Sequence, residues 1–134
     1  MRQLQDHAVI PHSSDLRIEV VDNPGIDGTC HHYRVTGFDT RSNPSDPFAE
    51  KHGEPAVYST VLFQNGTVNS VGSNGVTQEA LLAILIDRLR LFQAGEYSCR
   101  ENAIALTHLE DALHWLHHRT RNRMQRGVEG TMQK

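Results

Sequence analysis

The sequence has little that would indicate a secreted, membrane-spanning or fibrous protein. Its two cysteines, Cys30 and Cys99, are too few for a disulfide framework and favour reduced thiols in a cytoplasmic protein. The longest apolar run, residues 80–86, is far short of the roughly 18 residues of a membrane span. Residues 1–10 lack a signal-peptide pattern. With 134 residues, 37% of them hydrophobic, the composition predicts one globular domain over 1–134.

The signatures of common catalytic and metal sites are also missing. There is no Gly-x-Ser-x-Gly elbow and no Walker loop. His114 and His117 lack the glutamate of the zinc-protease pattern, and neither cysteine is separated by two residues from another cysteine or a histidine. The sequence therefore predicts no catalytic residue, no metal site and no cofactor.

The net charge of −3 is unevenly distributed. Residues 1–113 carry 8 Lys/Arg and 15 Asp/Glu, whereas residues 114–134 carry 5 Lys/Arg and 1 Asp/Glu. An acidic body repels the nucleic-acid backbone, which argues against a general DNA binder. A local basic cluster suits a small, highly charged anion instead.

The first half of the chain has the patterns of a small antiparallel sheet, over about residues 14–72. Alternation and β-branched residues predict strands at 16–22, 31–38 and 56–64, and Asn65-Gly66 is the favoured two-residue turn into a further strand at 67–71. The polar segment 39–54, with two prolines, is predicted to be a long loop and a candidate lid.

The second half changes to a helical period, over about residues 77–127. Thr77 is the predicted N-cap of a helix at 78–93 that ends at Gly95. Ser98 and Glu101 have capping-box spacing at the start of a second helix, from about Cys99 to Arg126. The short connection predicts an antiparallel hairpin. The fold class is therefore α+β, a small antiparallel β-sheet followed by a C-terminal antiparallel helical hairpin with a long second helix.

One face of the second helix carries a continuous row of packing positions, the seam. The second helix is also too long for the first helix to cover the whole of this face. The seam positions follow a 4,3 spacing: Asn102, Leu106, Leu109, Leu113, Leu116, Thr120 and Arg123. A first helix of about seventeen residues leaves the C-terminal third of the second helix without a partner in the chain. This excess length predicts oligomerisation, with Trp115 beside the seam at a subunit contact.

Two features are candidates for ligand binding, each with an ordinary structural alternative. Arg119, Arg123 and Arg126 share one helical face, and guanidinium binds phosphate in a bidentate manner. The same row can simply complement the negative end of the helix dipole. Phe92, at the end of the first helix beside a glycine-containing turn, is by its ordinary interpretation a core residue that closes the helix end.

Four segments of the second half resemble phage Thoeris anti-defence proteins of the first type, whose helical hairpin is shared with phage anti-CBASS sponges. The segments are Asn74–Leu82, Leu91–Gln93, Glu101–Ala103 and His117–Thr131. The ending His-Arg-Thr-Arg-x-Arg-x-x-Arg-Gly-Val-Glu-Gly-Thr is distinctive, and the similarity covers about residues 55–132.

The resemblance implies a sponge in the cytoplasm of the infected bacterial host that binds a cyclic ADP-ribose isomer made by a TIR-domain sensor and does not cleave it. It implies that Phe92 stacks on the adenine, Asn102 contacts the ligand, and Arg119 and Arg123 grip the diphosphate. Relatives that are hexamers also bind cyclic di- or trinucleotides at a second site. The candidates for that site are Arg126, Gly127, Gly130 and Thr131.

The helix geometry tests this assignment. Asn102 and Arg119 are seventeen residues apart on one predicted helix, roughly 25 Å at 1.5 Å per residue. One ligand of that class cannot touch both within one chain, so the pocket is expected between subunits of a homodimer or of a hexamer built from dimers. The alternatives are a nucleotide-hydrolysing enzyme, which needs a general base such as His117 or His118, and a nucleic-acid-binding regulator that uses the arginine row.

Overall fold

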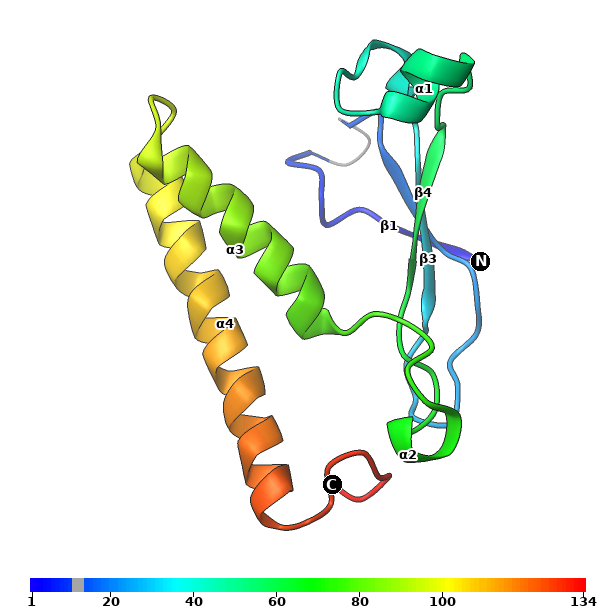
Figure 1. The fold of residues 1–134 in the computed structure, drawn as a ribbon, viewed down its shortest axis with the longest axis vertical. Helices are drawn as coiled ribbons and strands as arrows, with labels where there is room; N and C mark the ends of the chain where they lie inside the picture. Colours follow the sequence, from blue (N-terminus) through cyan, green and yellow to red (C-terminus); the bar gives the residue numbers. More distant parts are fainter. Residues whose placement is uncertain (11–13) are drawn as a thin grey trace. The chain divides into compact units, whose positions relative to one another are not determined.

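The computed structural model describes residues 1–10 and 14–134. Two compact units make up the chain, Met1–Phe63 and Gln64–Lys134. The first contains an antiparallel sheet and the second a C-terminal helical hairpin, which confirms the predicted α+β class (Figure 1). Whether residues 1–134 behave as one domain stays a prediction.

The sheet has four antiparallel strands in the order β1-β2-β3-β4: β1 (Arg2–Leu4), β2 (Arg17–Val20), β3 (His32–Thr36) and β4 (Tyr58–Leu62). The last three confirm the predicted strands. The sequence pattern missed β1, because three residues without alternation carry no periodic signal. Val20 is only 1% exposed and lies opposite Tyr33 on the neighbouring strand. The Tyr33 ring packs edge-on against Phe63, with the ring centroids 5.7 Å apart.

The connection between β2 and β3 is held by two carboxylates around a buried histidine. Asp22 accepts the backbone N–H groups of His31 and His32, at 2.9 and 3.1 Å. His31 is only 4% exposed, and its ring nitrogen Nε2 lies 3.0 Å from Asp27 Oδ2. Backbone donation by His31 lowers the pKa of Asp22, and backbone donation by Thr29 lowers that of Asp27. These contacts fix the turn that precedes β3.

Residues 39–54 are not the simple loop that was predicted, since they contain the 3-10 helix η1 (Thr40–Ser42) and the helix α1 (Pro47–His52). Asp46 caps α1 by accepting the N–H groups of Phe48 and Ala49. Asp46 as the N-cap followed by Pro47 at the first helical position is a helix-start signal, so Pro47 begins α1 and does not mark a loop. The proposed lid role of this segment stays a prediction.

The strand predicted at 67–71 is wrong, because this segment forms the short helix α2 (Val68–Val71). Asn74 Nδ2 donates to the Asn65 carbonyl at 2.7 Å, and the N–H of Asn74 donates to Gln64 Oε1 at 2.9 Å. The N–H of Gln64 donates to the Val76 carbonyl. These contacts between side chains and backbone close a broad loop, which outweighs the preference of Asn65-Gly66 for a tight hairpin.

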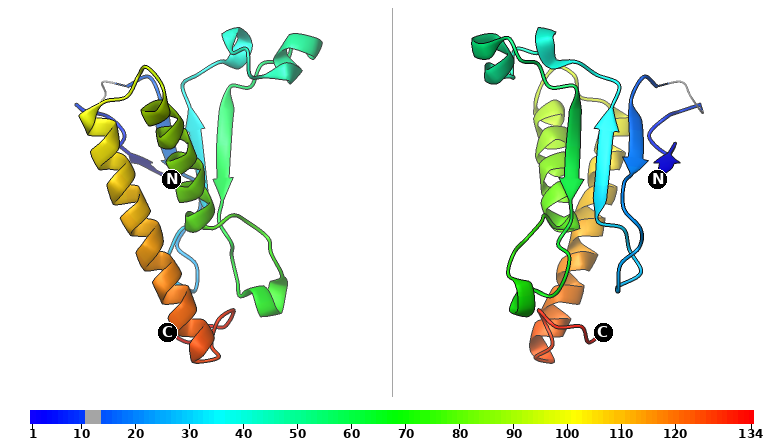
Figure 2. Two further views of the ribbon diagram at one scale, coloured as in Figure 1. Left: turned by 60° about the vertical axis from the view of Figure 1, so that its left-hand side comes forward. Right: turned by 90° about the vertical axis from the view of Figure 1, so that its right-hand side faces the viewer.

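The helical hairpin consists of α3 (Gln78–Ala94) and α4 (Arg100–Gln125), side by side and antiparallel (Figures 1 and 2). Thr77 caps α3 as predicted, with its Oγ1 accepting the N–H of Ala80 at 3.1 Å. The predicted capping box at Ser98 is wrong. Cys99 is the N-cap of α4, and its Sγ accepts the N–H of Asn102 at 3.4 Å.

The seam predicted on α4 is confirmed, because all seven of its positions are buried or half-buried while most of their neighbours are exposed. Ile86 of α3 is 3% exposed and forms the core of the hairpin. Arg90 on α3 and Glu110 on α4 form an ion pair at 2.7 Å. None of the helices in the described residues is long and apolar enough to cross a membrane.

Candidate ligand-binding site

Phe92 lies in the last turn of α3, next to a cavity. The cavity has a volume of about 280 Å³ and is lined by Arg88, Leu91, Phe92, Gly95 and Tyr97. The guanidinium carbon of Arg88 stands 5.2 Å from the centroid of the Phe92 ring, at cation–π distance. Phe92 is half-buried, so part of its ring is accessible at the cavity.

The turn between the helices keeps this end of the hairpin in place. Gln93 Oε1 accepts the N–H of Cys99 at 3.0 Å, which ties the end of α3 to the start of α4. Asn102 follows one turn into α4 and is half-buried. In the described part of the chain its side-chain amide makes no hydrogen bond, so its donor and acceptor groups remain available. Phe92 and Asn102 therefore flank the same turn.

The predicted arginine row is divided by the structure into exposed and buried members. Arg119 is exposed, and in the described residues its guanidinium has no hydrogen-bond or ion-pair partner. Arg123, one turn further on, is only 5% exposed. The two side chains have the predicted spacing on α4 but very different access to a ligand.

Arg123 is surrounded by the chain that follows α4. Its Nε donates to Glu129 Oε2 at 3.1 Å, and its Nη2 donates to the carbonyls of Val128 and Thr131 at 2.9 and 3.0 Å. Its Nη1 donates to the carbonyl of Gln133. The prediction that the end of this helix has no partner in the chain is therefore wrong at Arg123, because residues 128–133 cover it.

The four candidates for a second site lie at this same end of α4. Gly127 has φ 70°, and the N–H of Val128 donates to the Arg123 carbonyl at 3.0 Å, the geometry that commonly ends a helix at glycine. Arg126 Nη2 donates to the Lys134 carbonyl, and the Thr131 hydroxyl donates to the Val128 carbonyl. A Cβ on Gly130 would come within 3.1 Å of the Asn69 side-chain amide on α2.

The structure thus gathers the predicted residues into two groups rather than one. Phe92 and Asn102 lie at the turn, whereas the others lie at the C-terminal end of α4. The 26 residues of α4 span roughly 39 Å at 1.5 Å per residue. One chain does not bring Asn102 and Arg119 together. Arg88 and Tyr97 were missed by sequence reasoning, although the i, i+4 spacing of Arg88 and Phe92 is a usable signal.

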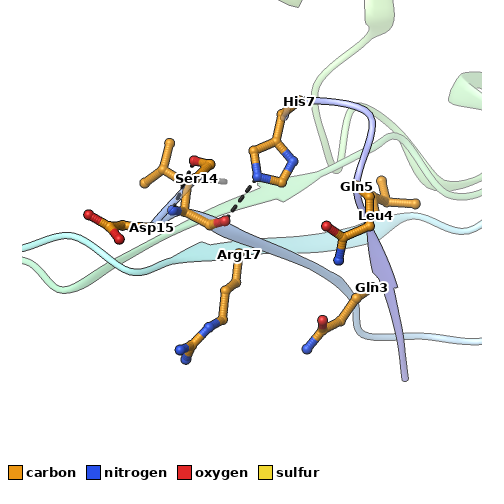
Figure 3. Close-up of a pocket in the computed structure, with 8 residues that line it drawn as sticks. Gln3, Leu4, Gln5, His7, Ser14, Asp15 and Arg17 are labelled. Atoms are coloured by element: carbon orange, nitrogen blue, oxygen red, sulfur yellow. Dashed lines mark hydrogen bonds between the residues drawn. The ribbon is translucent and has the colours of Figure 1, made fainter. Parts of the chain in front are cut away.

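A second hollow, of about 280 Å³, lies in the first unit and is shown in Figure 3. It is lined by polar side chains that include Gln3, His7 and Arg17. His7 Nε2 lies 2.9 Å from the Leu16 carbonyl oxygen, which ties the segment after β1 to the start of β2. None of the predicted ligand-binding residues contributes to this hollow. In the part of the chain that the structure describes, no group of three or more His, Cys, Asp or Glu side chains is arranged to hold a metal ion.

Comparison with known proteins places the chain in a family. Residues 56–121 match the family described as "Acb2/Tad1, hairpin domain", and the match covers β4, α2, α3 and most of α4. The chain is 46% identical over 112 residues to Thoeris anti-defense 1 of Bacillus phage SBSphiJ7. That alignment covers 84% of this chain and 73% of the relative. The fold and this similarity define a phage anti-defence protein with an Acb2/Tad1 hairpin. The chain belongs to the Thoeris anti-defense 1 family.

Proposed function

We propose that this protein is an anti-defence sponge inside the infected bacterium, which binds a cyclic ADP-ribose isomer made by a TIR-domain immune sensor and holds it without cleaving it. The observation that carries the proposal is the open cavity beside Phe92, on the hairpin that matches the family. It presents an aromatic ring and a cation to a ligand. An adenine stacked on Phe92 gains about 1–3 kcal/mol, by analogy with base stacking on aromatic side chains.

The complete site lies between two subunits in this proposal. Phe92 and the amide of Asn102 come from the hairpin turn of one chain, and Arg119 comes from the end of α4 in the other. The separation of these groups along α4 requires such an arrangement, and a twofold dimer then contains two identical sites. The exposed apolar side chains Ile84, Leu91 and Trp115, 65%, 67% and 65% exposed, offer surface that subunit association would cover.

The two arginines contribute differently. Arg119 offers an unpaired guanidinium that matches the oxygens of a diphosphate. Arg123 has five N–H donors and uses four of them on residues 128–133. In this proposal it adds one donor to the diphosphate and chiefly holds the C-terminal segment at the end of α4.

Sequestration without chemistry is supported by the lining of the cavity. The five lining residues include no carboxylate, histidine, cysteine or serine, and Tyr97 carries the one hydroxyl group among them. A sponge acts through affinity and abundance, and each tenfold gain in affinity corresponds to about 1.4 kcal/mol. The second site, at Arg126, Gly127, Gly130 and Thr131, is proposed for cyclic di- or trinucleotides in a hexameric form.

The test is a calorimetric titration of the purified protein with cyclic ADP-ribose isomers, followed by heating of the complex and identification of the released ligand. We expect tight binding by the wild type and release of unchanged ligand. Phe92→Ala and Arg119→Ala should each weaken binding at least tenfold. Arg121→Ala is the matched control, because Arg121 is an exposed arginine on the same helix outside the proposed site.

The possible results separate the functions. Recovery of a hydrolysed or opened product would indicate an enzyme. Tight binding of cyclic di- or trinucleotides without binding of any cyclic ADP-ribose isomer would restrict the function to the second site and to anti-CBASS activity. Strong, salt-sensitive binding of duplex DNA would indicate a nucleic-acid-binding regulator. If none of these ligands binds, the sponge function is refuted.

A further inference from the structure

Arg88 stands out among the cationic side chains of the hairpin because its guanidinium lies at the candidate cavity. It is exposed and lines the cavity together with Phe92. In the described residues its guanidinium has no hydrogen-bond or ion-pair partner and stands over the Phe92 ring, 5.2 Å from the ring centroid. Arg90, two residues further along α3, provides the contrast, since it pairs with Glu110 at 2.7 Å.

The helical spacing explains why Arg88 and Phe92 lie together. Residues four apart on a helix are neighbours on one face, about 6 Å apart along the axis. The long aliphatic stem of Arg88 follows this face and brings the guanidinium over the aromatic ring. One turn of α3 therefore presents a stacking surface and a positive charge together.

The size of the cavity indicates what part of a ligand it holds. Its volume of about 280 Å³ falls just below the roughly 300–1,000 Å³ of pockets that enclose a complete drug-sized ligand. It fits a nucleobase with its sugar, whereas the phosphate groups of a nucleotide would extend to the cavity mouth. Leu91 and Tyr97, 67% and 71% exposed, form the rest of this open rim and carry no charge.

The charge of Arg88 is available for such a phosphate. A guanidinium that is already paired with a carboxylate would have to give up that partner, but Arg88 has none in the described residues. Its planar group keeps five N–H donors for oxygen acceptors at the mouth of the cavity. A neutral rim would accept a nucleoside as readily as a nucleotide, whereas a cationic rim favours the nucleotide.

We propose that Arg88 is a further ligand-binding residue: its guanidinium closes the Phe92 cavity and binds a phosphate oxygen of the nucleotide whose base stacks on Phe92. This inference rests on the proposed function and adds a residue to that site. It makes the hairpin turn itself selective for anionic nucleotides, before any arginine of a second subunit is engaged.

The experiment compares Arg88→Gln, Arg88→Lys and the matched control Arg90→Gln by calorimetric titration with cyclic ADP-ribose isomers at two salt concentrations. We expect Arg88→Gln to weaken binding at least tenfold and to make it less sensitive to salt, because one ionic contact is lost. Arg88→Lys should keep the salt sensitivity and recover part of the affinity. Arg90→Gln should bind within about twofold of the wild type. Thermal melting of every variant measures its folding separately.

Each result decides the inference. If the wild type binds and Arg88→Gln binds equally well, Arg88 is not a ligand contact, and the sponge function stands without it. If Arg88→Gln weakens binding with unchanged salt sensitivity and a lower melting temperature, the role of Arg88 is structural and the inference is wrong. If the wild type binds no cyclic ADP-ribose isomer, the proposed function fails and the inference fails with it.

Discussion

Replacing Arg123 by alanine removes the side chain around which the C-terminal segment is organised. The guanidinium makes four hydrogen bonds to residues 128–133, one of them to the Glu129 carboxylate. Hydrogen bonds to charged groups contribute about 1.5–3 kcal/mol each. The Glu129 contact contributes less, because its side chain is 42% exposed. The total is on the order of 6 kcal/mol.

Ordering the backbone of these six residues costs about 1–2 kcal/mol per residue, a sum of similar size. The free energy gained from the hydrogen bonds of Arg123 therefore nearly equals the entropic cost of ordering residues 128–133. We expect Arg123→Ala to release residues 128–133 into solvent while the hairpin stays folded. Because the freed carbonyls return to water, the net loss in free energy of unfolding should be only about 1–2 kcal/mol.

Amide hydrogen exchange and urea denaturation measure the two effects separately. The N–H groups of Val128 and Thr131, which donate to the carbonyls of Arg123 and Val128, should lose their protection in the variant. Arg119→Ala, one turn earlier and exposed, should change the free energy of unfolding by less than about 0.5 kcal/mol. Unchanged exchange at Val128 and Thr131 would refute the reasoning, as would complete unfolding of the hairpin.

Three other changes test the fold. Ile86→Ala should lower the free energy of unfolding by about 2–5 kcal/mol, measured in urea, because Ile86 is 3% exposed in the hairpin core. Gly37→Ala should prevent stable folding of the sheet, seen by circular dichroism, because a Cβ there would overlap the backbone of Asp15 and φ is +92°. The Thr40 hydroxyl donates to Asp46 and lowers the pKa of that carboxyl below its usual 3.8. The ionised Asp46 carboxylate therefore stabilises the fold fully above pH 3.8, and this stabilisation is lost as the pH falls through the lowered pKa of the folded state. Asp46→Asn should remove this acid dependence, as followed by the amide signals of α1 in an NMR titration.

Matched controls keep these tests specific. Ile84→Ala should cost less than about 0.5 kcal/mol, because Ile84 is 65% exposed, and a loss that depends on protein concentration would assign it to a subunit contact. In Gly28→Ala the added Cβ has no atom within 4 Å, and φ is +82°. This variant should therefore lower the free energy of unfolding by only the roughly 1–2 kcal/mol that a left-handed backbone costs. If Ile86→Ala and Ile84→Ala have equal effects, the assignment of the core is wrong. Acid sensitivity of α1 that persists in Asp46→Asn would contradict the capping argument.

Regular patterns in the sequence predicted the main elements. Alternation located β2, β3 and β4, and the 4,3 spacing located the buried face of α4 along its full length. Both patterns work because the pleat of a strand and the turn of a helix repeat at fixed periods. The same local signals failed where a side chain reaches across several residues, as Asn74 does to Asn65.

The candidate site was predictable in its residue types and only partly in its arrangement. The sequence identified Phe92 and the arginine row through spacing and family resemblance. It placed Arg123 on the buried seam of α4 but gave no sign of the groups that bury it, because Glu129 and three carbonyls reach Arg123 only after Gly127 has reversed the chain. Every residue has a backbone carbonyl, so the residue types do not reveal which carbonyls accept hydrogen bonds from a given side chain.

The sequence by itself determined the α+β class, the hairpin, its seam and the family, because these depend on periodic burial and on residue identity. The tertiary structure decided that Arg119 is exposed and that Arg123 is buried and used to fold the chain. It also revealed Arg88 over the Phe92 ring, because side-chain direction and burial depend on neighbours brought together only by folding.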